Sequence, residues 1–155
     1  MRARRATRRA RRTRDLAGHV RRADIVVQRQ TTAQLARPGK QVCIVYGDGA
    51  FGLTGFDVET YARFNLPIVS VVGNNGAWNQ TTQGVVRRGG RGIGTYLSQA
   101  TDYAKIMEGM GGHGERVTDP AQIRPALERA FGSGRPALLD VVTDPKASYG
   151  DMGGR

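Results

Sequence analysis

Two short apolar runs, each ending abruptly at glycine and a polar residue, constrain the fold of this chain more than any other feature. The first covers residues 42–46 and is followed by Gly47-Asp48-Gly49; the second covers residues 68–72 and is followed by Gly73-Asn74-Asn75-Gly76. The segment between them has the length and apolar spacing of a helix. Two strands joined by a helix form a βαβ unit in which the strands are parallel. The polar residues after the two strands are therefore expected at the same edge of the sheet.

The apolar run over residues 42–46 predicts a strand buried on both faces, because its apolar residues are continuous rather than alternating. Cys43, the single cysteine of the chain, lies within this run. It is therefore expected to be a reduced core residue rather than a reactive thiol. The helix that follows is expected to begin at Thr54 or Gly55 and to end at Asn65-Leu66-Pro67.

The residues that follow the two strands predict a site for Mg²⁺ and a diphosphate. Open α/β sheets bind ligands at the carboxyl ends of their strands, which is where Asp48 and Asn75 are expected. A carboxylate oxygen and an amide oxygen suit Mg²⁺ or Ca²⁺ rather than zinc, and Mg²⁺ usually also binds phosphate oxygens. Gly49 and Gly76 would let the backbone approach a ligand closely. Free N–H groups in a turn over residues 49–51, ahead of the helix, could bind phosphate.

The remaining chain predicts a long glycine-rich loop followed by two more helix–strand units. Long loops in compact domains are often functional lids, and Trp78 within this one could either line a cofactor pocket or pack at the domain edge. An apolar stripe at helical spacing predicts core packing for the next helix. The stripe consists of Tyr103, Ile106, Met107 and Met110. The expected segments are a loop over 74–97, helices over 101–110 and 119–131, and strands over 114–117 and 136–142.

These motifs resemble the thiamine-diphosphate signature of the pyruvate oxidase, acetolactate synthase and oxalyl-CoA decarboxylase group. The resemblance rests on Gly47-Asp48-Gly49 followed at this distance by Asn74-Asn75. It extends to Ala36-Arg37-Pro38-Gly39-Lys40, Glu59-Thr60 and Asn65-Leu66-Pro67, and it covers roughly residues 32–144. It implies an α/β thiamine-diphosphate-binding fold, with a three-layer arrangement of a parallel sheet and helices on both faces. The fold is expected to be incomplete at its front.

The resemblance also implies roles for individual residues. Mg²⁺ would be bound by Asp48, by the Asn75 side chain and by the backbone carbonyl of Ala77. The amides of Gly49 and Ala50 would hold the diphosphate. The residues expected around the cofactor are Gly47, Asp48, Gly49, Ala50, Asn75, Ala77 and Trp78. No residue of this chain is expected to be catalytic.

The function that the resemblance implies is that of a C-terminal domain that binds thiamine diphosphate and Mg²⁺. It would belong to an acetolactate-synthase-like enzyme that acts on 2-oxo acids by decarboxylation or carboligation, with the cofactor supplying the chemistry. One alternative is a cofactor-binding subunit of a split enzyme resembling oxalyl-CoA decarboxylase or 2-hydroxyacyl-CoA lyase, with an acyl-CoA substrate. Another alternative is a nucleic-acid-binding protein that uses the arginine-rich head described below.

The resemblance implies a missing partner as well. In the family, the glutamate that activates the cofactor lies on a separate pyrimidine-binding domain, usually of the partner subunit. We expect this domain on another chain or absent, and we expect the chain to be inactive alone as a truncated domain. An intact protein of this kind would form a homo-oligomer.

The net charge of +11 is concentrated at the start of the chain. Residues 1–29 hold eleven arginines against Asp15 and Asp24. The sequence predicts a basic head over residues 1–31, a cofactor-binding domain over 32–145 and a flexible tail over 146–155. The head has no aromatic residue and too few apolar residues to form a core, so it is expected to be disordered or non-homologous. It is interpreted as a misassigned start or altered reading frame, as an inert tail, or as a nucleic-acid-binding or targeting arm.

Localisation follows from what the sequence lacks. No apolar run approaches the roughly 20 residues of a membrane span. The arginine-rich start has no apolar region after it, so no secretory signal is expected. A cytoplasmic protein without membrane contact is the default expectation, and a nucleic-acid partner is not favoured because the basic residues belong to the head rather than to the folded domain.

Overall fold

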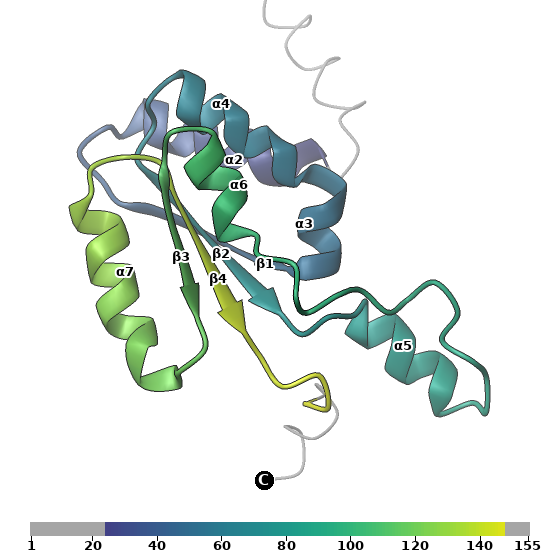
Figure 1. Cartoon of the computed structure of the whole chain (residues 1–155). Coiled ribbons are helices and arrows are strands. Elements are labelled where there is room, and N and C mark those ends of the chain that lie inside the picture. Colours follow the sequence, from purple (N-terminus) through teal and green to yellow (C-terminus); the bar gives the residue numbers. More distant parts are fainter. Residues whose placement is uncertain (1–23, 148–155) are drawn as a thin grey trace, which may run out of the picture.

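A four-stranded sheet, in which every neighbouring pair of strands is parallel, organises the computed structural model of this chain (Figure 1). The structure describes residues 24–147. The strand order is β1-β2-β4-β3. The strands are β1 (Val42–Gly47), β2 (Ile68–Asn74), β3 (His113–Val117) and β4 (Ala137–Val142). The predicted α/β fold with a parallel sheet is confirmed, and all four strands begin and end within two residues of their expected bounds.

Helices connect the strands, and several of them pack on the sheet. They are α2 (Asp24–Ala36), α3 (Asp48–Thr54), η1 (Gly55–Asp57), α4 (Val58–Arg63), α5 (Asn79–Val86), α6 (Ala104–Gly109), η2 (Pro120–Gln122) and α7 (Ile123–Gly132), where η denotes a short 3₁₀ helix. No described helix is both long and apolar enough to span a bilayer. The predicted tail from residue 148 onward, and the predicted head up to residue 23, lie outside the described residues. Residues 24–31, the described part of the predicted head, are helical and belong to α2.

Alternating side chains of the central strands divide the core into two clusters, one on each face of the sheet. On one face Ile68, Val72 and Leu138 pack with Tyr61 of α4 and Met107 of α6. On the other face the cluster contains Val69, Leu139 and Val141 together with Ala126 and Ala130 of α7. The apolar stripe predicted for the helix after residue 101 joins the first cluster, so its assignment to the core is confirmed.

The expectation that the first strand is buried on both faces is wrong. Ile44 and Tyr46 of β1 are buried against α3 and α4, but Val45 on the opposite face is 75% exposed. Cys43 points to this second face and is exposed, so it is not a core residue. The reason is that α7 packs on β4 and β3 rather than over the edge strand β1.

The helical segment between β1 and β2 begins earlier than predicted and is divided into α3, η1 and α4. It starts at Asp48, immediately after β1, instead of at Thr54 or Gly55. The first N–H groups of a helix lack intrahelical acceptors. The Asp48 carboxylate accepts one of them, from Gly49, over 2.8 Å. The chain therefore needs no separate turn between strand and helix.

The predicted loop over residues 74–97 contains a helix, α5 (Asn79–Val86). Its sequence has little helix-forming character, and short helices depend on contacts with the rest of the protein. Thr82 supplies such a contact, because its hydroxyl lies 3.1 Å from the Trp78 carbonyl and 3.3 Å from the Thr95 carbonyl. The helix is thus tied to the segment that follows it.

Close contact between α6 and β3 leads to a first prediction. A Cβ added at Gly114 would lie 2.3 Å from the Ala104 carbonyl oxygen, whereas a Cβ at Gly132 would meet nothing within 4 Å. Gly114→Ala should lower the free energy of unfolding by about 1–3 kcal/mol, because backbone atoms must move apart. Gly132→Ala should change it by less than about 1 kcal/mol. Urea denaturation of both variants measures this, and equal midpoints would contradict it.

A second prediction concerns pH. The hydrogen bond from Arg129 holds the pKa of Glu115 below its ordinary value of 4.5. A lowered folded-state pKa adds stability above the unfolded-state pKa, and this stability disappears as the pH falls through the folded-state pKa. Glu115→Gln should therefore lower the melting temperature at pH 7, and the difference from wild type should shrink below about pH 4.5. A difference of the same size at pH 7 and pH 3 would rule out this cause.

Candidate cofactor and metal site

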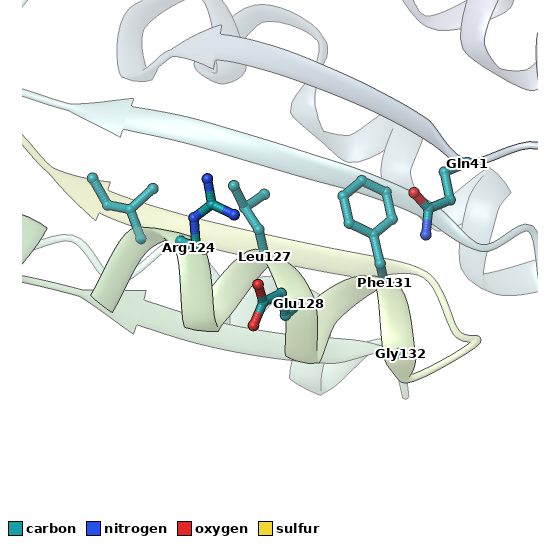
Figure 2. A pocket seen from close by; sticks show the side chains of 7 residues that line it. Gln41, Arg124, Leu127, Glu128, Phe131 and Gly132 are labelled. Atoms are coloured by element: carbon teal, nitrogen blue, oxygen red, sulfur yellow. The ribbon is translucent and has the colours of Figure 1, made fainter. Parts of the chain in front are cut away.

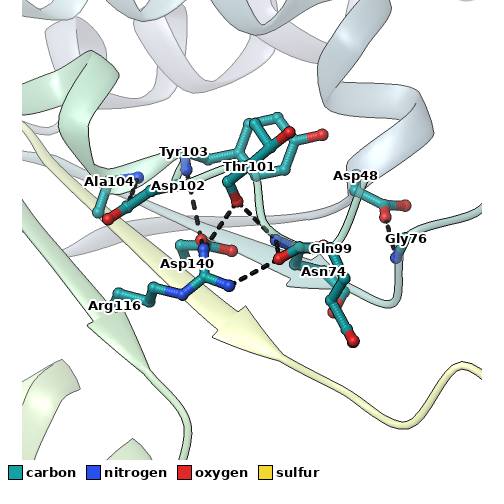
Figure 3. Close-up of polar contacts among 10 residues, drawn as sticks. All are labelled: Asp48, Asn74, Gly76, Gln99, Thr101, Asp102, Tyr103, Ala104, Arg116 and Asp140. Carbon is teal, nitrogen blue, oxygen red and sulfur yellow. Dashed lines mark hydrogen bonds and ion pairs between the residues drawn. The ribbon is translucent and has the colours of Figure 1, made fainter. Parts of the chain in front are cut away.

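The buried carboxylate of Asp48 connects the carboxyl ends of β1 and β2. Its Oδ1 accepts the N–H of Gly49 at 2.8 Å. Its Oδ2 accepts the N–H of Gly76 at 2.6 Å (Figure 3). The same oxygen accepts the N–H of Ala77 at 3.2 Å. The side chain is only 2% exposed. The structure thus brings Asp48 and the turn after β2 together, as the βαβ interpretation predicts.

Asn75 and Ala77 place two further oxygen atoms beside this carboxylate. The Ala77 N–H lies 3.1 Å from Asn75 Oδ1 as well as 3.2 Å from Asp48 Oδ2. A carboxylate oxygen and an amide oxygen therefore converge on one nitrogen atom. This is the pair of donors that the sequence predicts at a shared edge.

The backbone of Ala77 is oriented by an isolated antiparallel bridge to Tyr96. The bridge is formed by the bonds Leu97 N–Gly76 O (2.7 Å) and Trp78 N–Thr95 O (2.8 Å). In this type of pair the N–H and C=O of the central residue point away from its partner. The Ala77 carbonyl therefore faces the side of Asp48 and Asn75, and within residues 24–147 no hydrogen bond to it is found.

This donor set fits a hard cation that also binds phosphate. Among the described residues, no three His, Cys, Asp or Glu side chains gather at a possible metal site. A metal ion here would rely on one carboxylate, one amide and one backbone carbonyl. Oxygen donors of this kind, few in number, suit Mg²⁺ that shares its coordination with a diphosphate and water.

Trp78 lies against the start of α3. A Cβ added at Gly49 would be 2.6 Å from Cδ2 of the half-buried Trp78 indole, so only glycine allows this contact. The Gly49 N–H is already paired with Asp48, although the sequence alone treats it as free. Gly47 ends β1, and Ala50 belongs to the first turn of α3, where N–H groups have no intrahelical acceptor.

A cavity of about 310 Å³ adjoins this edge. Asn75, Gly76 and Ala77 line it on one side, and Lys146 supplies a positive charge on its wall. A larger cavity of about 570 Å³ lies along α7 and reaches Gln41, at the amino end of β1 (Figure 2). It lies away from the strand ends that carry the convergent oxygen atoms, so cavity size does not mark the candidate site.

A second buried carboxylate near this edge escapes prediction from the sequence. Asp140 of β4 is fully buried and pairs with Arg116 of β3 at 2.7 Å (Figure 3). Burial raises the pKa of Asp140, while the nearby amide of Asn74 and the charge of Arg116 act in the opposite direction. A charged residue inside the apolar run Ala137–Val142 was the available signal.

Two other polar residues, Glu59 and His113, pair with neighbouring charged side chains instead of joining the group around Asp48. Glu59 is exposed on α4 and pairs with Arg63 at 3.0 Å, one turn away. His113 lies 3.5 Å from Glu115 on β3.

Comparison with known proteins places this geometry in context. Residues 29–141 match the family model described as "Thiamine pyrophosphate enzyme, C-terminal TPP binding domain". The chain is 46% identical over 117 residues to a probable acetolactate synthase of Mycobacterium bovis, covering 76% of the chain and 21% of that protein. It is 35% identical to a 2-hydroxyacyl-CoA lyase of Oryza sativa, covering 74% of the chain and 21% of that protein. It is also 35% identical to an oxalyl-CoA decarboxylase of Escherichia coli, covering 70% of the chain and 19% of that protein. The chain thus spans about a fifth of the length of these curated relatives.

The hydrogen bonds of Asp48 lead to a third prediction. Asp48→Ala removes the acceptor of three backbone N–H groups and should lower the free energy of unfolding by about 1–3 kcal/mol or more. Asp57→Ala is the matched control, because Asp57 is exposed and forms no side-chain cap for α4. That change should cost less than about 0.5 kcal/mol. Chemical denaturation of both variants gives the comparison, and equal losses would argue against the role of Asp48 in the turn.

Proposed function

The chain belongs to the thiamine pyrophosphate enzyme family, as its C-terminal cofactor-binding domain, and we propose that it holds the cofactor's diphosphate through Mg²⁺ at the edge around Asp48. The observation that supports this most directly is the convergence of Asp48 Oδ2 and Asn75 Oδ1 on the Ala77 N–H. Thiamine pyrophosphate is the same compound as thiamine diphosphate.

The proposed Mg²⁺ ligands from this chain are the Asp48 carboxylate, the Asn75 amide oxygen and the Ala77 carbonyl. Diphosphate oxygens and water would complete the octahedron that Mg²⁺ requires. Gly47, Gly49, Ala50 and Trp78 would surround the diphosphate. When bound, thiamine diphosphate supplies the carbanion-stabilising chemistry, and the residues of this chain bind and orient it.

We further propose that the chain alone is not catalytic. The two buried carboxylates at this edge are engaged, since Asp48 accepts three N–H groups and Asp140 pairs with Arg116. Neither is available within the described residues as the acid or base that activates the cofactor. A pyrimidine-binding domain, on another chain or outside this one, would supply the activating acid or base. The active unit would then contain at least two domains.

The proposed substrate class is a 2-oxo acid, supported by the 46% identity to a probable acetolactate synthase. An acyl-CoA substrate is the second candidate, supported by the 35% identity to two enzymes named for CoA esters. Lys146 on the wall of the adjoining cavity could contact an anionic group in either case.

The metal-dependent binding can be tested by calorimetric titration of thiamine diphosphate into the purified chain, with Mg²⁺ or with EDTA. We expect binding only with Mg²⁺. Asn75→Ala should weaken it by about tenfold or more, because loss of a ligand or its support typically has this effect on metal affinity. Asp48→Asn should act similarly, with Asp57→Asn as the charge-matched control. Circular dichroism checks that each variant is folded, since Asp48 also supports the turn. Equal binding in EDTA, or no binding by the folded chain, would refute the proposal.

The absence of activity is tested separately. The purified chain with thiamine diphosphate and Mg²⁺ should release no CO₂ from pyruvate or from oxalyl-CoA above the buffer rate. Substrate-dependent release that is lost in Asn75→Ala would show that the chain is catalytic by itself and would overturn this part of the proposal.

A further inference from the structure

The ion pair between Arg116 and Asp140 joins two neighbouring strands beside the candidate site (Figure 3). The two residues are direct partners in the register of β3 and β4. Nη1 of Arg116 lies 2.7 Å from Oδ2 of Asp140, and the carboxylate side chain is fully buried. An ion pair with a buried carboxylate contributes little net stability compared with apolar residues of similar volume, because burial removes hydration from the charge. The role of this ion pair is therefore expected to lie in the backbone segments that it positions.

The same ion pair binds the segment that leads from α5 to α6. Arg116 donates from Nη1 to the Thr101 carbonyl and from Nη2 to the Gln99 carbonyl, each at 2.7 Å. Asp140 Oδ2 accepts the Tyr103 N–H at 3.3 Å. Three alternate residues of one irregular segment are thus bound by a single pair of side chains. The planar guanidinium can bind all of these acceptors at once because its donors have a fixed fork geometry.

Residues 97–99 of that segment also contact the turn that carries Asn75 and Ala77. Leu97 N donates to the Gly76 carbonyl at 2.7 Å. Gln99 Nε2 donates to the carbonyls of Asn74 (3.1 Å) and Thr143 (2.7 Å). Gly76 has a φ of +71°, and a Cβ there would lie 3.2 Å from Gln99 Cβ. The position of residues 97–99 therefore determines the path of the turn.

We propose that Arg116 and Asp140 are positioning residues for the Mg²⁺–diphosphate site. By fixing residues 97–103, they hold the carbonyl side of Gly76 while Asp48 holds its N–H side. Asn75 and Ala77, on either side of Gly76, are thereby held with their oxygen atoms together. This inference rests on the proposed function for its effect on binding, but its effect on the turn can be measured without any ligand.

The single tryptophan makes that measurement possible. Trp78 directly follows the turn, packs on Gly49 and donates its N–H to the Thr95 carbonyl. The test variant combines Arg116→Met with Asp140→Leu, which leaves no unpaired charge and keeps the volume similar. We expect a folded protein with a red-shifted Trp78 emission, greater acrylamide quenching and about tenfold weaker Mg²⁺-dependent binding of thiamine diphosphate.

Two further variants keep the test decisive. Gln99→Ala removes contacts to Asn74 and Thr143 without touching the ion pair, so it decides the question if the double variant is unfolded; its Trp78 emission should shift in the same direction. Arg116→Lys keeps the charge but not the fork, and it should give an intermediate shift. Arg129→Lys, at an exposed arginine paired with Glu115, is the matched control and should give none.

The outcomes separate the two proposals. A folded double variant with wild-type Trp78 emission and wild-type cofactor affinity would make the ion pair purely structural and overturn the inference, as would an unchanged emission in Gln99→Ala. A shifted emission, in a chain whose wild type binds no thiamine diphosphate, would support the positioning role and refute the proposed function instead.

Discussion

Backbone N–H groups from two strand ends meet on one carboxylate, and the rest of the candidate site depends on this contact. Gly49 belongs to the helix after β1, and Gly76 and Ala77 belong to the turn after β2. Asp48 binds all three, so the two strand ends cannot separate without leaving buried polar groups unsatisfied, which is costly. The turn is thus organised by the protein itself. A site that is formed before its ligand arrives avoids the entropic cost of ordering it on binding.

The polar network around Arg116 extends this organisation across the sheet. Asp48 acts between β1 and β2, whereas Arg116 and Asp140 act between β3 and β4. Residues 97–103 cross between the two regions. The carboxyl edge of all four strands is therefore connected by side chains that bind backbone groups, while the packed apolar faces determine only that the strands lie together.

The sequence predicts those features of the fold and the site that depend on residues close together in the chain, and it misses those that depend on distant contacts. The bounds of β1 and β2 can be predicted to within two residues because their apolar runs stop at glycine, and the meeting of Asp48 with Asn75 follows from βαβ topology alone. The helix α5 escapes prediction because it is supported by a contact from Thr82 to the Thr95 carbonyl, outside the helix, rather than by helix-forming residues. Cys43 was assigned wrongly because an apolar run does not reveal which face of an edge strand a helix covers. The pairing of Arg116 with Asp140 depends on strand register, which no short motif encodes.

The exposed face of β1 affects how the protein behaves at high concentration. Among the described strands, β1 pairs only with β2, so its outer edge offers unpaired backbone groups next to the exposed Val45. Edges of this kind are templates for pairing with another chain. Cys43 on the same face could then form a disulfide between two such chains. The isolated chain is therefore expected to self-associate slowly on storage, and a reducing agent would limit the covalent part of that association.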